Sequence, residues 1–191
     1  EKSGHVVNIV TRIKGDGAKL IAMAKSNASE YLSFKAGRTG KEIVALEELG
    51  KLLGMDKIPE YIESYDISNL GSTGMVAGMV VFNNGRPLKS AYRKFSMKEN
   101  IIQNDIGCMK EVLKRRFTHY VNGDEGFDRM PDLILVDGGT NQVNAVKEAL
   151  SELSLSTNVF GMVKDNKHRT RAIATSGEEI SVSDMKPAFF L

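Results

Sequence analysis

Three titratable residues of this 191-residue chain stand where a hydrolytic metal site could form. Asp66 interrupts an apolar strand pattern, where a carboxylate is costly unless it is paired or bound to a cation. Asp137 ends a short apolar run, and α/β sheets tend to place their sites at the ends of such buried strands. His168 lies in a basic loop just past a further strand. Together they offer two oxygen ligands and an imidazole, which suit a divalent cation acting on a phosphodiester.

Each of these residues also has an ordinary structural explanation. Asp66 could accept hydrogen bonds from a turn, Asp137 could belong to a turn because two glycines follow it, and His168 could be a surface residue. The two glycines could admit a phosphate to the N-terminus of the next helix, or they could form a tight strand-to-helix turn. Residue types and spacing alone therefore leave a metal nuclease as one hypothesis among several.

Hydrophobic periodicity predicts the elements that would position these residues. A helical lead-in is expected over residues 16–53, and Asn83-Asn84-Gly85 predicts a hairpin turn. Pro87 lacks a backbone N–H, which places its strand at a sheet edge. The predicted strands are 61–68, 75–82, 87–95, 133–136 and 159–163, with a closing hairpin at 172–174 and 179–182. One helix is predicted to follow residue 104 or 105, and a second to begin near Thr140.

The resulting order, β-β-β-α-β-α-β behind a helical lead-in, predicts an α/β fold with a mixed sheet and helices packed on its faces. A right-handed crossover from the first strand to the fourth would set them side by side and parallel, which is the ribonuclease H arrangement. It would bring Asp66 and Asp137 together on neighbouring central strands. We expect residues 1–57 to form the helical lead-in, packed on the core, and residues 58–191 to form the ribonuclease H-like domain.

Composition narrows the class of protein. A single cysteine, Cys108, excludes an internal disulfide framework and a cysteine-based zinc cluster, fits a reducing cytosol, and is expected to be buried. No apolar run approaches the roughly 18 residues of a membrane span. The chain begins at Glu1 and ends on an apolar run at 188–191, which we interpret as a domain of a longer protein.

The net charge of +2 conceals a strongly segregated charge pattern. Residues 86–98, 110–119 and 164–171 carry net charges of +5, +3 and +3, whereas residues 42–63 carry −4. Each basic segment by itself is typical of a solvated face. If the three converged in space, they would form a track for a phosphate backbone.

Several separate blocks of this sequence, in the same order, resemble the C-terminal endonuclease half of UvrC, a subunit of the bacterial excinuclease. The resemblance extends into the lead-in around residues 11–32. Two positions depart from it: Thr140-Asn141 replaces a common Lys-Gly pair and Asn166 a common arginine, which removes possible phosphate contacts. The blocks are YDISN at 65–69, VVF at 80–82, GRPLKS at 85–90, YRKF at 92–95, MKEVLKRRF at 109–117, PDLILVDGG at 131–139, Gln142 with Asn144-Ala145, and DNKHRT at 165–170.

The resemblance implies a ribonuclease H-like domain that makes the incision 5′ to a DNA lesion in nucleotide excision repair. It assigns Asp66, Asp137 and His168 as the catalytic residues, with Mg²⁺ or Mn²⁺ as the cofactor. It also implies damaged double-stranded DNA and UvrB as partners, with UvrA acting upstream, a bacterial cytoplasmic location and no membrane partner.

His168 would be a metal ligand or a proton-transfer group. Candidate backbone contacts, which would set register rather than read bases, are Arg93, Lys94, Arg115, Arg116, Lys167 and Arg169. The alternatives are a non-catalytic DNA-binding or scaffold module, and a nuclease that acts on RNA–DNA hybrids.

Overall fold

The computed structural model of the chain describes residues 21, 23–25, 27–28, 40–69, 75–97, 105–165 and 170–181. The chain divides into two compact units, Glu1–Ile43 and Val44–Leu191. The described residues between 21 and 28 are helical, and helix α2 covers Gly40–Leu52. The rest of the predicted lead-in lies outside the described residues. The domain boundary between residues 57 and 58 stays a prediction.

Eight strands form one mixed sheet in the described part of the chain, in the order β3-β2-β1-β5-β6-β7-β8, with β4 also paired to β2. The strand β1 runs antiparallel to β2 and parallel to β5, and β5 runs parallel to β6. This is the predicted ribonuclease H-like arrangement. The strands are β1 (Tyr61–Asn69), β2 (Met75–Asn83), β3 (Arg86–Pro87), β4 (Arg93–Ser96), β5 (Leu133–Asp137), β6 (Asn158–Lys164), β7 (Thr170–Ala174) and β8 (Glu179–Ser181).

The turn between β2 and β3 follows its sequence signal, but the strand after it does not. Asn84 and Gly85 have φ of 55° and 78°, which confirms the hairpin turn. The single return strand predicted at 87–95 is wrong, because β3 ends at Pro87 and a 3₁₀ turn at Lys89–Ala91 separates it from β4. Proline offers no N–H to continue the ladder. Both short strands pair with β2 at the sheet edge, as predicted.

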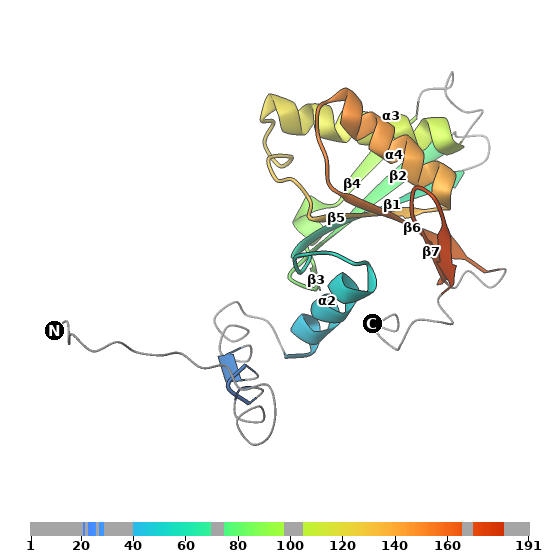
Figure 1. Ribbon diagram of the computed structural model, residues 1–191. Coiled ribbons are helices and arrows are strands. Elements are labelled where there is room, and N and C mark those ends of the chain that lie inside the picture. Colours follow the sequence, from blue (N-terminus) through green and yellow to red (C-terminus); the bar gives the residue numbers. More distant parts are fainter. Residues whose placement is uncertain are drawn as a thin grey trace. The chain divides into compact units, whose positions relative to one another are not determined.

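Helices α3 (Asp105–Asn122) and α4 (Thr140–Glu152) cover one face of the sheet, above it in Figure 1. Apolar side chains of both helices form the main core with Tyr65 and Val136 of the sheet, and Met109, Val112, Phe117, Val143 and Val146 are at most 1% exposed. Cys108 is fully buried, as predicted.

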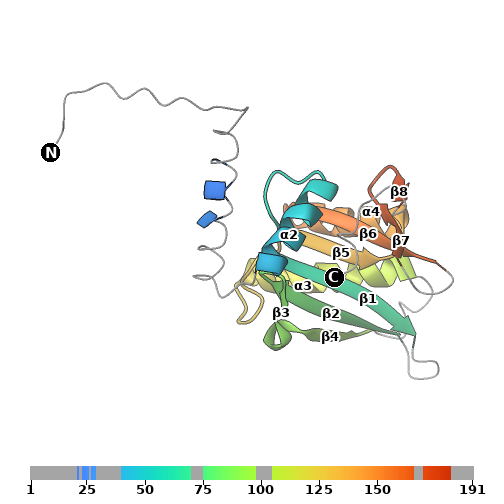
Figure 2. The same ribbon diagram turned by 90° about the horizontal axis from the view of Figure 1, so that it is seen from below.

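The face of the sheet opposite α3 and α4 is covered by fewer of the described residues. Leu46 of α2 and Leu53, the residue after this helix, pack on Ile62, Leu133 and Ile173 in a second, smaller core. Figure 2 views this face and shows α2 at one end of the sheet, with the C-terminal end of β1 away from it. Among the described elements, the sheet therefore has an open area on the α2 side. No helix in the described ranges is both long and apolar enough to span a membrane.

Candidate active site

The strand register brings Asp66 and Asp137 together. Pairing of β1 with β5 sets Tyr65 opposite Val136, so the next residues on these parallel strands, Asp66 and Asp137, are also neighbours. Side chains alternate between the faces of a strand. Because Tyr65 points into the core under α3 and α4, Asp66 points to the opposite, open face. The prediction that these two aspartates approach each other on central strands is confirmed.

The carboxyl groups of Asp66 and Asp137 are hydrogen-bonded to each other, and their pKa values shift in opposite directions. Partial burial alone would raise the pKa of Asp66, but hydrogen bonds with Asp137 and Ser68 and the charge of Lys164 lower it below its usual value. Burial and the adjacent Asp66 raise the pKa of Asp137, although Lys164 acts against this rise. Two carboxylates so close resist simultaneous ionisation. A bound cation would relieve that repulsion.

Two polar side chains hold the pair in place. Ser68 Oγ donates to Asp66 Oδ2 at 2.9 Å, and Lys164 Nζ donates to Asp137 Oδ2 at 2.6 Å. Lys164 is the last residue of β6, two positions beyond Met162, which pairs with Asp137. In the sequence, Lys164 stands out only as the first residue of the basic segment 164–171. The signal that could have found it is its position at the end of the strand next to β5.

Glycines allow the turn after Asp137 to pass close to β6. Gly138 has φ of 143°, in the region that favours glycine, and its N–H donates to the carbonyl of Met162 at 3.1 Å. A Cβ on Gly161 would collide with the carbonyl oxygen of Gly138. Gly139 precedes α4, and its N–H donates to Gln142 Oε1 at 3.1 Å. These contacts favour the tight-turn interpretation of the two glycines, with Thr140 as the first helical residue rather than its cap.

Arg116 was predicted to contact DNA, and that prediction is wrong. Its side chain is 2% exposed, and its Nη2 lies 2.6 Å from Oε1 of the fully buried Glu63. The guanidinium also donates to the carbonyls of Phe127 and Arg129. Tyr65 donates its hydroxyl to Glu63 Oε2 at 2.6 Å, and burial and the Glu63 carboxylate raise the pKa of this phenol. The network leaves Arg116 no surface to offer a phosphate.

The other cations predicted to bind DNA differ in how they are held. Arg93 donates to the carbonyls of Ser90 and Tyr92, and Arg115 donates to that of Ser96 and lies over the Phe95 ring. Lys94 is exposed and points away from the core. His168, Lys167 and Arg169 lie outside the described residues. The DNA-binding roles of the five basic residues and the catalytic role of His168 stay predictions.

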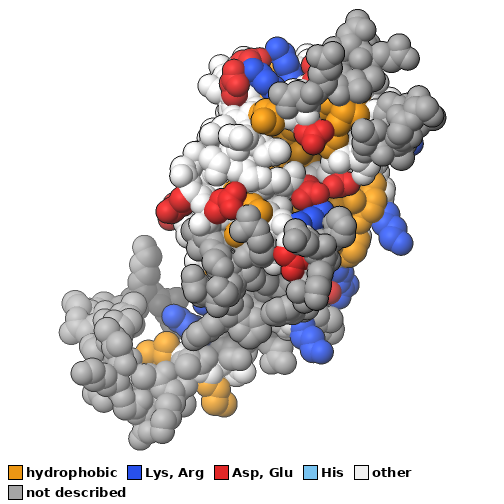
Figure 3. Space-filling model, turned by 90° about the vertical axis from the view of Figure 1, so that its right-hand side faces the viewer, with side chains coloured by type: hydrophobic (Ala, Val, Ile, Leu, Met, Phe, Trp, Pro, Cys, Tyr) orange, Lys and Arg blue, Asp and Glu red, His pale blue; other side chains and the backbone are white. Residues whose placement is uncertain are grey.

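The charge of the segment at 110–119 is largely neutralised within the protein. Lys110 pairs with Glu148 and Glu152, and Lys114 pairs with Glu152, which ties α3 to α4. On the face drawn in Figure 3, acidic and basic side chains of the described residues are interspersed rather than gathered into one basic field. On this face, a track for DNA would therefore rest on particular residues rather than on a continuous basic field.

The residues at this site fit a divalent cation in part. Carboxylate oxygens are the ligands that Mg²⁺ and Mn²⁺ prefer, and Mg²⁺ commonly relies on one or two of them. Asp66 and Asp137 supply such a pair on rigid strands. Within the described ranges, no group of three or more His, Cys, Asp or Glu side chains is arranged to hold a metal.

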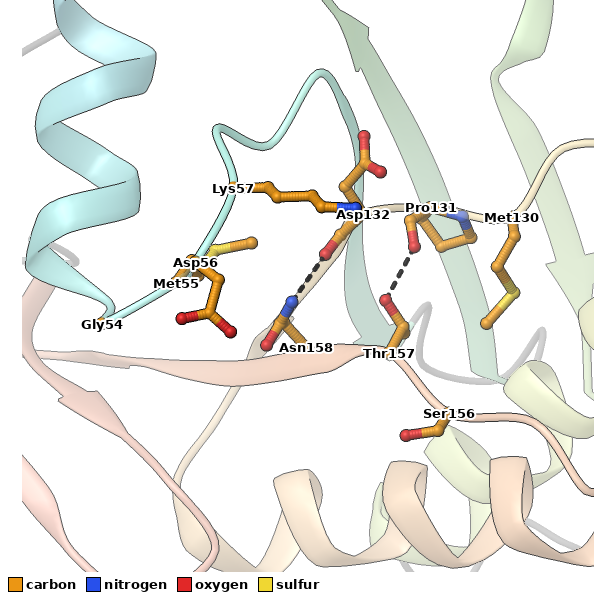
Figure 4. A pocket seen from close by; sticks show the side chains of 10 residues that line it. All are labelled: Gly54, Met55, Asp56, Lys57, Met130, Pro131, Asp132, Ser156, Thr157 and Asn158. Atoms are coloured by element: carbon orange, nitrogen blue, oxygen red, sulfur yellow. Dashed lines mark hydrogen bonds between the residues drawn. The ribbon is translucent and has the colours of Figure 1, made fainter.

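A separate pocket of about 400 Å³ lies at the other end of the sheet, where β5 and β6 begin. Figure 4 shows two hydrogen bonds among its lining residues: Thr157 Oγ1 donates to the carbonyl of Pro131, and Asn158 Nδ2 to that of Asp132. The Asp132 carboxylate accepts the backbone N–H groups of Glu60 and Tyr61. Thr157, Asn158 and Asp132 thus have a structural role, because their side chains join neighbouring loops and strands.

Comparisons with known proteins agree with this geometry. Residues 50–191 match the family described as the UvrC RNAse H endonuclease domain. The chain is 42% identical over 197 residues to the UvrABC system protein C of Ruminiclostridium cellulolyticum, which covers 98% of this chain and 32% of that protein. It is 45% identical over 179 residues to that of Caldicellulosiruptor saccharolyticus, covering 94% and 30%.

The chain thus spans about a third of the length of these curated relatives. The crystal structure of human ENDOV gives a TM-score of 0.39 at 10% identity, over 64% of this chain and 67% of that one, which is too distant to carry weight. The match over residues 50–191 and the identity of 42–45% to relatives along nearly the whole chain are decisive. This chain belongs to the UvrC family and contains its ribonuclease H endonuclease domain.

Proposed function

We propose that this chain is a metal-dependent DNA endonuclease domain that hydrolyses a phosphodiester 5′ to a lesion in bacterial nucleotide excision repair. The observation that carries the proposal is the adjacent, hydrogen-bonded pair of Asp66 and Asp137 on the face of two neighbouring parallel strands that lies opposite α3 and α4. The name of its relatives refers to the UvrABC system. We therefore also propose damaged duplex DNA as its substrate and UvrB as its partner, with UvrA acting upstream.

In this proposal Asp66 and Asp137 would hold Mg²⁺ or Mn²⁺, an ion that neutralises phosphate charge and lowers the pKa of an attacking water. The hydroxyl of Ser68 fixes the orientation of the Asp66 carboxylate, and the ammonium of Lys164 fixes that of Asp137. His168 would act as a further ligand or would transfer a proton. The rigid strands keep the carboxylates in position without rearrangement, which favours catalysis.

The test compares incision by the wild type, Asp66→Ala and the matched control Asp128→Ala, which changes an exposed aspartate between α3 and β5. Each is incubated with an end-labelled lesion duplex in Mn²⁺, in Mg²⁺ or in chelator. We expect metal-dependent incision on the 5′ side by the wild type and the control, and no incision by Asp66→Ala, with DNA binding retained in all three.

Other outcomes of the same experiment point to the alternatives. Incision retained by Asp66→Ala would refute the assignment. Preferential cleavage of an RNA–DNA hybrid, assayed beside the lesion duplex, would make the chain a hybrid nuclease. Binding without any incision, even when UvrB is supplied, would leave a non-catalytic DNA-binding module.

A further inference from the structure

A row of directly paired residues crosses four strands from the sheet edge to the aspartate pair. Lys94 of β4 pairs with Gly78 of β2, and Gly78 pairs with Asp66 of β1, next to Asp137 of β5. Side chains of directly paired residues lie on the same face of a sheet. Because strands are spaced about 4.8 Å apart, the Cα atoms of Lys94 and Asp66 are separated by about 10 Å.

Burial confirms that this row lies on the open face. On either side of Lys94 and Gly78 along their strands, Phe95, Ala77 and Met79 are at most 5% exposed and belong to the core under α3 and α4. Lys94 and Gly78 must therefore point the other way, to the same side as Asp66. The lysine and the two carboxylates are thus separated only by a glycine.

The conformation and packing of Gly78 do not account for a glycine there. Its φ is not positive, and a Cβ built on it would have no described atom within 4 Å. Glycine within a strand weakens the sheet and often marks a place where a ligand or another backbone approaches closely. The neighbours on the same face of β2, Val76 and Val80, do carry side chains. The space over Gly78 is therefore a gap in an otherwise filled row.

Lys94 provides a cation at the far end of this gap. Its side chain is exposed and makes no hydrogen bond or ion pair with a described residue. Lys110 and Lys114, by contrast, are bound by carboxylates of α4, and the guanidinium of Arg93 is held by carbonyls. The ammonium of Lys94 is thus available to a phosphate on the side of the sheet that carries Asp66 and Asp137.

We propose that the gap over Gly78 seats the sugar–phosphate backbone of the DNA strand that is cut, and that Lys94 binds a phosphate of the same strand. The strand then crosses β1 and β2 toward the sheet edge, with the scissile phosphate at the two aspartates. Gly78 is a positioning residue, since it acts by leaving room. The inference rests on the proposed endonuclease function and adds the direction in which the bound DNA strand runs across the sheet from the two aspartates.

The test uses the full chain with Gly78→Leu, which fills the gap, and Gly78→Ser as the matched small substitution. Displacement of the backbone by about 1 Å costs on the order of 100-fold in rate, so Gly78→Leu is expected to lose about that much in kcat/KM. Gly78→Ser should keep most of it. Neither variant should unfold at a lower urea concentration than the wild type, because the core is unchanged and glycine weakens a strand. Mn²⁺ binding should remain as in the wild type for both, because the carboxylates do not change.

Lys94→Gln tests the second contact. The slope of log binding affinity against log salt concentration is expected to fall by about one, equally for all sequences. In a second assay, each phosphate of the cut strand is replaced in turn by an uncharged methylphosphonate. Replacement of the phosphate that Lys94 binds, beside the cut, should weaken binding by the wild type. Lys94→Gln should be insensitive at that position alone.

The inference is overturned if Gly78→Leu cuts within about twofold of the wild type, or if Lys94→Gln keeps the wild-type salt slope and methylphosphonate pattern. Either result would leave the endonuclease function standing. Failure of that function appears elsewhere, as incision retained by Asp66→Ala or absent from the wild type.

Discussion

Replacing Arg116 with methionine tests whether the buried ion pair holds α3 against the sheet. The side chains of Arg116 and Glu63 are 2% and 0% exposed, and two guanidinium nitrogens donate to Glu63 Oε1 at 2.6 and 3.2 Å. The variant would leave a buried carboxylate with Tyr65 as its remaining donor, and two carbonyls without theirs. Removing one partner of such a pair costs about 3–5 kcal/mol.

Urea unfolding followed by circular dichroism measures the loss in the free energy of unfolding, and thermal unfolding followed in the same way measures the fall in Tm. A domain of this size loses about 2–4 °C of Tm per kcal/mol, so Arg116→Met should melt about 6–20 °C below the wild type. The control is Lys114→Met on the same helix, where a 49%-exposed lysine bridges to Glu152 at 2.9 Å. An exposed pair of this kind contributes little to stability, so Lys114→Met should melt close to the wild type.

The double variant Glu63→Gln with Arg116→Met separates an uncompensated charge from lost packing. Because it leaves no ion in the core, it should be more stable than Arg116→Met alone. If Arg116→Met costs no more than Lys114→Met, the pair is hydrated in solution and the reasoning from burial fails. If the double variant is as unstable as the single one, packing of the long side chain is the larger contribution.

Two further predictions concern the glycine contact beside Asp137 and the junction between α3 and α4. Gly161→Ala should push the turn at Gly138 away from β6, costing about 1–3 kcal/mol in urea unfolding and weakening Mn²⁺ binding, whereas Gly107→Ala, with open space around it, should do neither. Hydrogen bonds with Lys110 and Lys114 lower the pKa of Glu152 from 4.5 to about 2. The contribution of the Glu152 carboxylate to folding stability is therefore complete above pH 4.5 and is lost as the pH falls through 2. An NMR titration should place its midpoint there, and near 4.5 in Lys110→Met with Lys114→Met; an unshifted wild-type midpoint would contradict the two contacts.

The elements that place the aspartate pair could be predicted because they follow local rules. The apolar run before Asp137 marks a buried parallel strand, and Asn84-Gly85 marks a hairpin turn. The crossover rule then sets β1 beside β5, and with it Asp66 beside Asp137. The break at Lys89–Ala91 was missed, since a proline at an edge predicts where a ladder weakens but not where it resumes.

Arg116 was misassigned although the sequence held the signal for its burial. Met109, Val112, Leu113 and Phe117 form the buried stripe of α3, and Arg116 falls within the same helical repeat. Glu63 likewise alternates in phase with Tyr61 and Tyr65, which face the core. Neither pattern identifies Glu63 and Arg116 as partners, because 53 residues separate them in the sequence. The position of Lys164 at the end of β6 makes it a candidate for the site, but its contact with Asp137 depends on the register of β6, which no local pattern fixes.

The two carboxylates of β1 show how the fold separates structure from chemistry. Glu63 lies on the core face, where Arg116 and Tyr65 satisfy it with three hydrogen bonds. Asp66 lies three residues on, on the opposite face, and shares with Asp137 one cation among the described residues, Lys164. Two carboxylates against one ammonium leave an excess of negative charge on rigid strands. A cation from solution would supply the missing charge, and such an ion beside the gap over Gly78 would in turn attract a phosphate.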